Sequence, residues 1–294
     1  MMRHSAFSAD EIHAATFVRY IEIHDTLGST NDRAAELAGD ADMELPALVV
    51  ARHQTAGRGR GENTWWSADG ALTFSVVLDP AALGIRTASW PQLSLTTAVA
   101  VCDALASELK LDDRRAGSSA TPAGLEDEPA RYSPKPRIGI KWPNDVLIDG
   151  RKVCGILIES PGGSAVANNR LIVGIGININ NSWRTPPDGN WSGIALCDLT
   201  AKQHDLQAVL VGTLQALKYR GEQLASNDSR LSAAWQQLCW LREQYLEVVS
   251  NGVRRAAGEC AGIDRDGALL LRSSTGTERV YSGSVCFRRN THSS

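Results

Sequence analysis

Four strand-like segments follow one another along the chain without a helix between them, and they constrain the fold more than any other feature. They are residues 138–142, 146–148, 153–159 and 171–179. Short turns join the first three, with Pro143-Asn144-Asp145 in the first turn and Asp149-Gly150 in the second. A doubly wound parallel sheet needs strands and helices to alternate regularly. The run of strands therefore predicts an α+β fold.

Further strands and helices are predicted on both sides of this run. Apolar residues indicate strands at 17–23, 48–51 and 72–78, and the last of these alternates clearly. Ser29 is a suitable N-cap for a helix that ends at Gly39. A longer helix opens at Ser89, because apolar residues then recur every four positions as far as Leu109. Two more helices are expected at 205–224 and 231–246.

The chain divides into a large part and a small part. Residues 112–136 interrupt the pattern with four prolines and the run Gly117-Ser118-Ser119, which predicts a solvated, mobile insertion. From Gly252 the sequence changes to short strands with a turn at Asp266-Gly267. We therefore predict a large domain over residues 1–248, which contains the insertion, and a small all-β domain over residues 249–294.

Composition and charge exclude several classes of function. A hydrophobic content of 43% and a charged content of 21% are ordinary for a globular protein. The net charge of -3 gives no general attraction to nucleic acid or to anionic membranes. No apolar run reaches the roughly 18 residues that span a bilayer, and residues 1–15 lack the apolar core of a signal peptide. The six cysteines show neither metal-site nor disulfide spacing. We expect a cytoplasmic protein with buried free thiols.

A glycine-rich loop carries the first candidate chemistry. Residues 54–61 read Gln-Thr-Ala-Gly-Arg-Gly-Arg-Gly and leave a predicted strand. The glycines let backbone N–H groups approach a ligand, and Arg58 and Arg60 offer charged, planar donors that suit carboxylate and phosphate. Neither the P-loop pattern nor G-x-G-x-x-G is present. The loop either binds an anion in an unusual cradle or is a mobile surface loop with solvated charges.

Lys141 is the second candidate, because it ends a predicted strand whose other residues are apolar. Burying an ammonium group without an anionic partner is costly, which favours a ligand anion beside Lys141. The alternative is that the side chain reaches the sheet edge and solvent. Asn144 follows in the turn, where turn formation alone explains it.

Two glycines inside a strand suggest that another group approaches the backbone there. Gly174 and Gly176 interrupt the segment 171–179, and interior glycines weaken a strand unless close approach requires them. Asn178 follows on the same strand, where strand-end capping is the alternative explanation. Trp65 directly follows the glycine-rich loop and is placed to wall a pocket.

Taken in order along the chain, these segments resemble a biotin–protein ligase. The resemblance rests on residues 29–31, 54–60, 65, 141–145, 152–159 and 174–178. The tail at 262–271 resembles the small C-terminal module of the same family. Each motif is short, but the ordered set spans nearly the whole chain. The resemblance implies a mixed β-sheet backed by helices, followed by a small C-terminal SH3-like β-barrel.

The resemblance also implies a reaction in two steps. The carboxylate of biotin would attack the α-phosphorus of ATP, and a lysine of a biotin carboxyl carrier protein would then attack the biotinyl-adenylate. ATP and Mg²⁺ would be required, with the ligands of Mg²⁺ left unassigned. The partner would be the carrier domain of acetyl-CoA carboxylase or a related carboxylase, with no DNA or membrane involved. A homodimer is compatible with the resemblance.

By the same resemblance, individual residues receive expected roles. Catalysis is assigned to the cations Lys141, Arg58 and Arg60. Biotin is expected to contact Ser29, Thr30, Asn31, Gln54, Gly57, Arg58, Gly59, Arg60, Lys141 and Gly155. ATP is expected to contact Arg58, Arg60, Trp65, Lys141, Asn144 and Asn178. The loop departs from the family pattern at Glu62, where further glycine and arginine are common, so its closure is expected to rest on fewer charges.

Three other functions stay open. A lipoate–protein ligase shares the fold and the adenylation chemistry, although the loop and the C-terminal module favour biotin. A bifunctional ligase and repressor needs a helix-turn-helix domain, which we do not expect within the 28 residues that precede Ser29. A module that only binds biotin would not need Arg58, Arg60 and Lys141. We therefore expect a monofunctional biotin–protein ligase.

Overall fold

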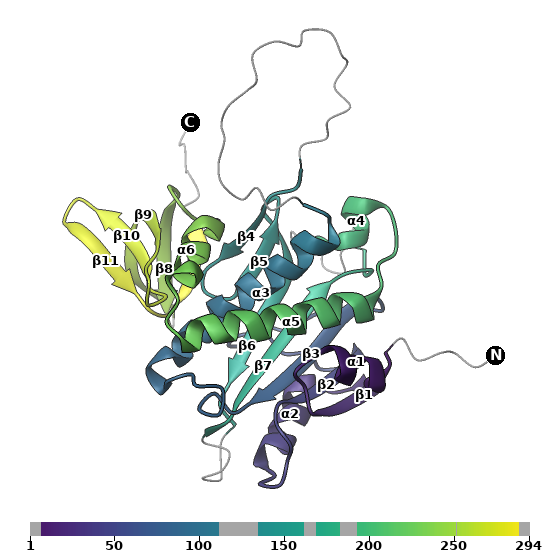
Figure 1. Ribbon diagram of the computed structural model, residues 1–294. Coiled ribbons are helices and arrows are strands. Elements are labelled where there is room, and N and C mark those ends of the chain that lie inside the picture. Colours follow the sequence, from purple (N-terminus) through teal and green to yellow (C-terminus); the bar gives the residue numbers. More distant parts are fainter. Residues whose placement is uncertain (1–6, 112–134, 162–168, 183–192, 251, 288–294) are drawn as a thin grey trace.

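The structure is a computed structural model that describes residues 7–111, 135–161, 169–182, 193–250 and 252–287. The predicted insertion at 112–136 lies outside the described residues, except for its last two positions. Two β-sheets organise the described part of the chain, a larger one of seven strands and a smaller one of five (Figure 1).

The seven-stranded sheet has the order β1-β2-β3-β7-β6-β5-β4. β1 pairs with β2 in parallel, and every other neighbouring pair is antiparallel. The α+β class with a mixed sheet is therefore confirmed. The strands are β1 (Tyr20–Leu27), β2 (Ala47–Gln54), β3 (Ala71–Leu78), β4 (Ile138–Lys141), β5 (Asp145–Ile148), β6 (Arg151–Glu159) and β7 (Leu171–Asn178).

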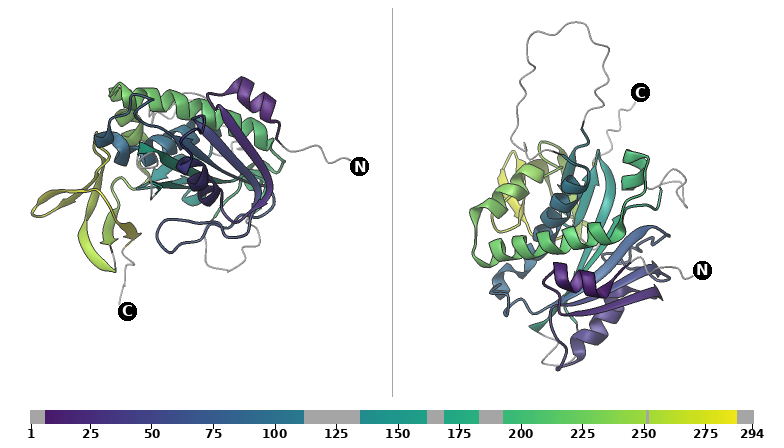
Figure 2. Two further views of the ribbon diagram at one scale, coloured as in Figure 1. Left: turned by 90° about the horizontal axis from the view of Figure 1, so that it is seen from below. Right: turned by 45° about the vertical axis from the view of Figure 1, so that its right-hand side comes forward.

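Helices cover both faces of this sheet. Figures 1 and 2 show α3 (Leu93–Glu108) and α5 (Leu206–Ala225) side by side across one face, where they form the large core. α2 (Thr30–Gly39) packs on the opposite face with a smaller apolar cluster. The other helices are α1 (Ala9–Ala15), the 3₁₀ turn η1 (Thr87–Gln92), α4 (Leu196–Thr200) and α6 (Ser229–Leu238). None of the helices in the described ranges is both long and apolar enough to cross a membrane.

β3 shows how the sequence assigns the two faces of the sheet. Its alternating apolar side chains all pack into the large core, as the pattern predicts: Leu72, Phe74, Val76 and Leu78. Thr73 and Ser75 point to the other face because side chains alternate along a strand. They are only 1% and 0% exposed, so they must find hydrogen-bond partners inside the protein. Polar groups are therefore buried on the face that carries α2.

The five-stranded sheet has the order β11-β10-β9-β8-β12, and its neighbouring strands are all antiparallel. An antiparallel sheet is what an SH3-like module requires, although β11 and β12 stay unpaired with each other, so the described strands do not close into a barrel. The strands are β8 (Tyr245–Ser250), β9 (Val253–Ile263), β10 (Leu269–Ser273), β11 (Gly276–Val280) and β12 (Ser284–Phe287).

One predicted helix is wrong at its C-terminal half. The segment expected to be helical over 231–246 is helical only as far as Leu238, and β8 begins at Tyr245. The backbone N–H of Trp240 donates to the carbonyl of Ile140 at 2.9 Å, so the chain leaves the helix to pair with the edge of β4. Apolar spacing predicted a continuous helix because it does not register this tertiary pairing. The domain boundary proposed at 248/249 falls inside β8, which pairs with β9.

Candidate functional site

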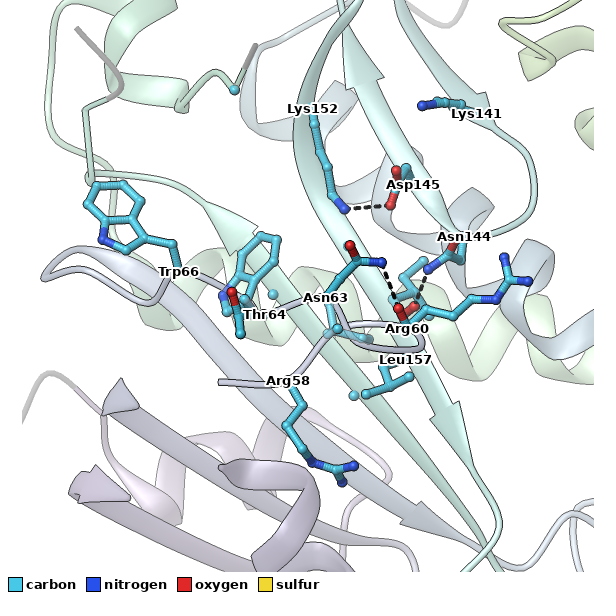
Figure 3. A pocket seen from close by; sticks show the side chains of 18 of the residues that line it. Arg58, Arg60, Asn63, Thr64, Trp66, Lys141, Asn144, Asp145, Lys152 and Leu157 are labelled. Atoms are coloured by element: carbon cyan, nitrogen blue, oxygen red, sulfur yellow. Dashed lines mark hydrogen bonds and ion pairs between the residues drawn. The ribbon is translucent and has the colours of Figure 1, made fainter. Parts of the chain in front are cut away.

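A cavity of about 630 Å³ opens on the face of the large sheet that buries Thr73 and Ser75. Its walls come from the start of α2, the loop after β2, the hairpin of β4 and β5, the middle of β6 and β7, and β12 of the small sheet. Figure 3 shows the side chains that these elements direct around it. Segments from both sheets therefore meet at one site.

The cavity collects nearly all of the residues that the sequence predicts for a site. Gly57 is the exception, because it does not line the cavity. A Cβ at Gly57 would lie 2.5 Å from the carbonyl oxygen of Trp65, so this glycine allows the loop to fold back tightly. The predicted residues that do line the cavity are Ser29, Thr30, Asn31, Gln54, Arg58, Gly59, Arg60, Trp65, Lys141, Asn144, Gly155 and Asn178.

The glycine-rich loop folds into a compact turn that is closed by hydrogen bonds within the loop. The N–H of Gly59 donates to the carbonyl of Asn63 at 2.7 Å. The N–H of Trp65 donates to the carbonyl of Gly57 at 2.9 Å. Gly61 sits at the tip with φ of 66°, which favours glycine. The Asn63 amide also donates to the Arg60 carbonyl at 2.7 Å. Asn63, which lies where the sequence departs from the family pattern, thus helps to close the turn.

The two loop arginines are tied to different parts of the protein. Arg58 donates to both oxygens of Glu159, at 2.8 and 2.6 Å, and approaches Asp32 at 2.9 Å. Burial lowers the pKa of Arg58, but the hydrogen bonds and charge of the two carboxylates outweigh that effect and raise it. Arg60 donates to the Gly283 carbonyl at 2.8 Å, next to β12. In Figure 3 both guanidinium groups point away from Lys152.

Two lysines lie at the other side of the cavity, on the two strands that flank β5. Nζ of Lys141, at the end of β4, lies 5.7 Å from the ring centre of Phe287 in β12. Lys152, on β6, pairs with Asp145 at 2.7 Å (Figure 3) and lies 5.9 Å from the ring centre of Trp65. We predicted no role for Lys152 from the sequence, although Lys152 is the first residue of segment 152–159, on which the family resemblance partly rests. A lysine at the start of an apolar strand was the signal available to find it.

The interior glycines of β7 make room for side chains, as their position in a strand predicts. A Cβ at Gly174 would lie 2.1 Å from Oδ1 of Asn31. A Cβ at Gly176 would lie 2.3 Å from Cε2 of Trp65. The indole N–H of Trp65 is buried without a hydrogen-bond partner in the described part of the chain. Because buried donors normally find acceptors, this N–H is available to donate a hydrogen bond to an acceptor atom of a ligand in the cavity.

A chain of buried polar groups runs behind the cavity wall at the start of α2. The hydroxyl of Ser75 lies 2.7 Å from that of Thr30 and 2.6 Å from Oδ1 of Asn31. Nδ2 of Asn31 donates to Oε2 of Glu159 at 2.7 Å. The N–H of Thr30 donates to Oε1 of Gln54 at 2.7 Å. Ser29 occupies the predicted N-cap position of α2, but its side chain makes no cap hydrogen bond.

Asn144 and Asn178 line the cavity and also fix its backbone. Nδ2 of Asn144 donates to the Ile156 carbonyl at 2.8 Å, and Nδ2 of Asn178 donates to the Lys152 carbonyl at 3.3 Å. The two amides hold β6 at the place where it forms the wall. Their expected contacts with a nucleotide stay predictions.

Cationic side chains outnumber carboxylates on the described wall of the cavity, although Arg58 is also paired with Glu159 and Asp32. Four cationic side chains line the cavity: Arg58, Arg60, Lys141 and Lys152. Among the described lining residues, Asp145 has the one carboxylate, and Lys152 neutralises it. No group of three or more His, Cys, Asp or Glu able to hold a metal occurs in the described ranges. The cavity therefore suits a ligand with several negative charges and an apolar part.

Comparison with protein-family models identifies both parts of the chain. Residues 25–178 match the model described as "Biotin/lipoate A/B protein ligase family". Residues 254–288 match the model "Biotin protein ligase C terminal domain". The first match covers all the predicted site residues, and the second contains β12 with Phe287.

Similar proteins extend this comparison over most of the chain. A biotin–[acetyl-CoA-carboxylase] ligase of Paracoccus denitrificans is 31% identical, over 88% of this chain and 97% of that protein. The bifunctional ligase/repressor BirA of Bacillus subtilis is 30% identical, over 91% of this chain and 74% of that protein. A solved biotin protein ligase from Aquifex aeolicus, in complex with biotin and ATP, superposes with a TM-score of 0.72. It is 23% identical and covers 93% of this chain and 100% of its own, which shows a shared fold.

Proposed function

Because the chain belongs to the biotin/lipoate A/B protein ligase family, we propose that it uses ATP to join biotin to a lysine of another protein, with the cavity as its active site. Relatives that match most of the chain are named as ligases of biotin. The enzyme would form biotinyl-adenylate first and transfer the biotinyl group second.

The observation that carries this proposal is that four cations line a single cavity, with Arg60 and Lys141 outside the ion pairs that Lys152 and Arg58 form with described carboxylates. The first step brings the carboxylate of biotin against a triphosphate, so two anions must be held in contact. Fixed positive charge in a partly enclosed site stabilises this arrangement far more than water does. A solvated surface loop would not need its cations to line the same cavity as two further lysines.

In the first step, a carboxylate oxygen of biotin forms a bond to the α-phosphorus of ATP. The bond from that phosphorus to the bridging oxygen breaks, and its electron pair leaves with pyrophosphate. We assign Lys141 and Lys152 to this charge, because both line the cavity and they come from β4 and β6, the two strands on either side of β5. No protein nucleophile is needed, so the contribution of the site is positioning and electrostatic stabilisation.

The loop arginines would hold the intermediate in place. Arg58 fastens one side of the loop to Glu159, and Arg60 fastens the other side to the small sheet through the Gly283 carbonyl. A loop fixed at both sides can shield a mixed anhydride from water. Direct contacts of both arginines with the biotin carboxylate or the phosphates stay predictions.

In the second step, the amine of the acceptor lysine attacks the carbonyl carbon of biotinyl-adenylate. The bond to the phosphate oxygen breaks, AMP leaves, and the amine gives up a proton. We propose that the acceptor is a biotin carboxyl carrier domain, because relatives carry the name of acetyl-CoA carboxylase ligase. We propose that the small sheet helps to seat that domain, because β12 lines the cavity beside Lys141.

Mg²⁺ belongs with ATP in this proposal. The donor set fits an ion brought by the triphosphate, because Asp145 is the one carboxylate among the described lining residues. Asp145 would supply the protein oxygen donor for such an ion, in place of its present pairing with Lys152. When bound, the ion would screen the negative charge of the phosphates.

Biotin is favoured over lipoate by the second family match. The C-terminal match at residues 254–288 is to a module named for biotin protein ligases, whereas the match at residues 25–178 covers ligases of both substrates. The buried polar groups at Thr30, Asn31 and Gln54 also suit the ureido ring of biotin, which the dithiolane of lipoate lacks. The cytoplasmic location and the homodimer stay predictions from the sequence.

Transfer to a carrier domain tests the proposed function directly. The protein is incubated with ATP, Mg²⁺, biotin and a purified biotin carboxyl carrier domain, and intact-protein mass spectrometry follows the carrier. We expect a mass increase of one biotinyl group that disappears when the acceptor lysine of the carrier is replaced by arginine. An unmodified carrier after incubation with an intact, folded enzyme would contradict the proposal.

Removing Arg60 should make the active site leak its intermediate. Arg60→Gly deletes the hydrogen bond to Gly283 that fastens the loop to the small sheet. We expect biotinyl-adenylate to leave the variant about tenfold faster, the effect of losing one charge-assisted hydrogen bond. Release is measured by rapid gel filtration of preformed, radiolabelled intermediate. Retention equal to that of the parent protein would refute the role given to Arg60.

A further inference from the structure

Glu159 does not line the cavity, yet its carboxylate joins the glycine-rich loop to the polar chain behind the wall. Its two oxygens accept two hydrogen bonds from Arg58, and Oε2 also accepts one from Nδ2 of Asn31 at 2.7 Å. A carboxylate paired with a guanidinium can only accept hydrogen bonds. The group of Asn31 that faces Glu159 must therefore be its NH₂.

The orientation of the Asn31 amide then decides the next contact. With its NH₂ on Glu159, the carbonyl oxygen of Asn31 faces the hydroxyl of Ser75 at 2.6 Å. A carbonyl oxygen cannot donate, so Ser75 donates to Asn31. Gly174 makes room for the Asn31 amide, because a Cβ there would lie 2.1 Å from the same oxygen. Asn31 and Ser75 are 4% and 0% exposed, so water does not offer an alternative partner.

The last contact follows from proton counting. A serine hydroxyl has one hydrogen, and Ser75 uses it on Asn31. The contact of 2.7 Å between the hydroxyls of Ser75 and Thr30 can then form only if Thr30 donates to Ser75. Thr30 lines the cavity. With its only hydrogen used, its hydroxyl can act toward a ligand only as an acceptor.

We propose that Glu159 is a positioning residue that, through Asn31 and Ser75, makes Thr30 a hydrogen-bond acceptor for an N–H of the ureido ring of biotin. This inference rests on the proposed function, because it takes biotin as the substrate. Gln54 completes the match: its Oε1 accepts from the N–H of Thr30 at 2.7 Å, which leaves Nε2 to donate to the ureido carbonyl. Acceptor and donor are then both fixed before the ligand arrives, and such preorganisation strengthens binding.

Exchanging the carboxylate of residue 159 with the amide of residue 31 tests the donor-to-acceptor direction of these hydrogen bonds. Glu159→Gln allows residue 159 to donate, so the Asn31 amide can turn over and Thr30 can become a donor. The swap Glu159→Gln with Asn31→Asp keeps the total charge and restores an acceptor-only group beside Ser75. Asp32→Asn is the matched control, because Asp32 contacts Arg58 at 2.9 Å and is outside the Thr30–Ser75–Asn31 chain. The readout is the dissociation constant of biotin by calorimetry, with thermal denaturation as the folding check.

We expect Glu159→Gln to weaken biotin binding about tenfold, the effect of one buried hydrogen bond facing the wrong way. The double swap should recover binding to within about threefold of the parent, and Asp32→Asn should change it by about twofold or less. A double swap that binds as weakly as Glu159→Gln would overturn the proposal. If Glu159→Gln alone does not fold, the affinity of the double swap decides by the same threefold criterion.

The parent protein separates failure of this inference from failure of the proposed function. If the parent releases no pyrophosphate when given biotin and ATP-Mg, the proposed function fails, and the role of Glu159 falls with it. If the parent is active and the double swap does not recover biotin binding, only the role of Glu159 fails. If Glu159 has a purely structural role, adding Asn31→Asp to Glu159→Gln should weaken biotin binding further. If Glu159 sets the direction of the hydrogen bonds, adding Asn31→Asp should restore biotin binding.

Discussion

Replacing Lys141 with alanine is expected to lower the rate of biotinyl-adenylate formation by about 10²- to 10³-fold, the usual effect of removing one transition-state charge partner. Lys141 ends β4 on the cavity wall, opposite the loop arginines and beside Phe287. Negative charge moves from the biotin carboxylate toward the leaving pyrophosphate in this step. A fixed ammonium group stabilises that charge more in the transition state than in the ground state.

The measurement is biotin-dependent exchange of labelled pyrophosphate into ATP, which reports the first step alone. Lys218→Ala is the matched control, because Lys218 lies on the exposed side of α5 and loses the same charge outside the cavity. Exchange by the control should equal that of the parent. Exchange by Lys141→Ala within about tenfold of the parent would remove Lys141 from the chemistry.

Adding one methyl group at Gly174 is expected to reduce both stability and biotin binding. In Gly174→Ala the new Cβ would lie 2.1 Å from Oδ1 and 2.8 Å from Cγ of Asn31. The amide must move, and it is buried between Ser75 and Glu159, so both hydrogen bonds are strained. Overpacking of this kind costs about 1–3 kcal/mol of unfolding free energy. Biotin affinity should fall by about tenfold or more, because Thr30 loses its fixed direction.

Urea denaturation measures the stability of this variant, and calorimetry measures its affinity for biotin. Gly212→Ala is the matched control, because Gly212 lies within α5 and a Cβ there would meet nothing within 4 Å. Alanine favours a helix by up to about 1 kcal/mol over glycine, so the control should be unchanged or more stable. If Gly174→Ala binds biotin like the parent, the packing of Asn31 against β7 does not shape the site.

The large sheet could be predicted from sequence because its signals are local. The alternation of Leu72, Phe74 and Val76 marks one face of β3, and tight turns mark the hairpins around β5. The interior glycines of β7 predicted that other groups approach this strand closely. The structure identifies these groups as the side chains of Asn31 and Trp65. Gathering the loop, Lys141 and α2 into one cavity required only that these elements share a sheet face.

What sequence could not predict depends on contacts between distant segments. The helix expected to continue beyond Leu238 ends because Trp240 pairs with β4, about 100 residues earlier in the chain. Lys152 gains its position from pairing with Asp145 and from the ring of Trp65. The sequence also did not indicate which groups hold the arginines of the loop, namely Glu159 for Arg58 and the Gly283 carbonyl for Arg60. Apart from Asp145, which lies in the strand directly before that of Lys152, these partners are distant in sequence.

The most direct test of the central claim gives the protein ATP-Mg with biotin in one reaction and with lipoate in another, and no carrier domain in either. Mass spectrometry then looks for the acyl-adenylate that stays bound to the protein. The cavity with four cations, the polar groups of Thr30 and Gln54, and the biotin-type C-terminal module predict biotinyl-adenylate and pyrophosphate from biotin alone. Lipoyl-adenylate as the main product, or no adenylate from either acid, would contradict the account.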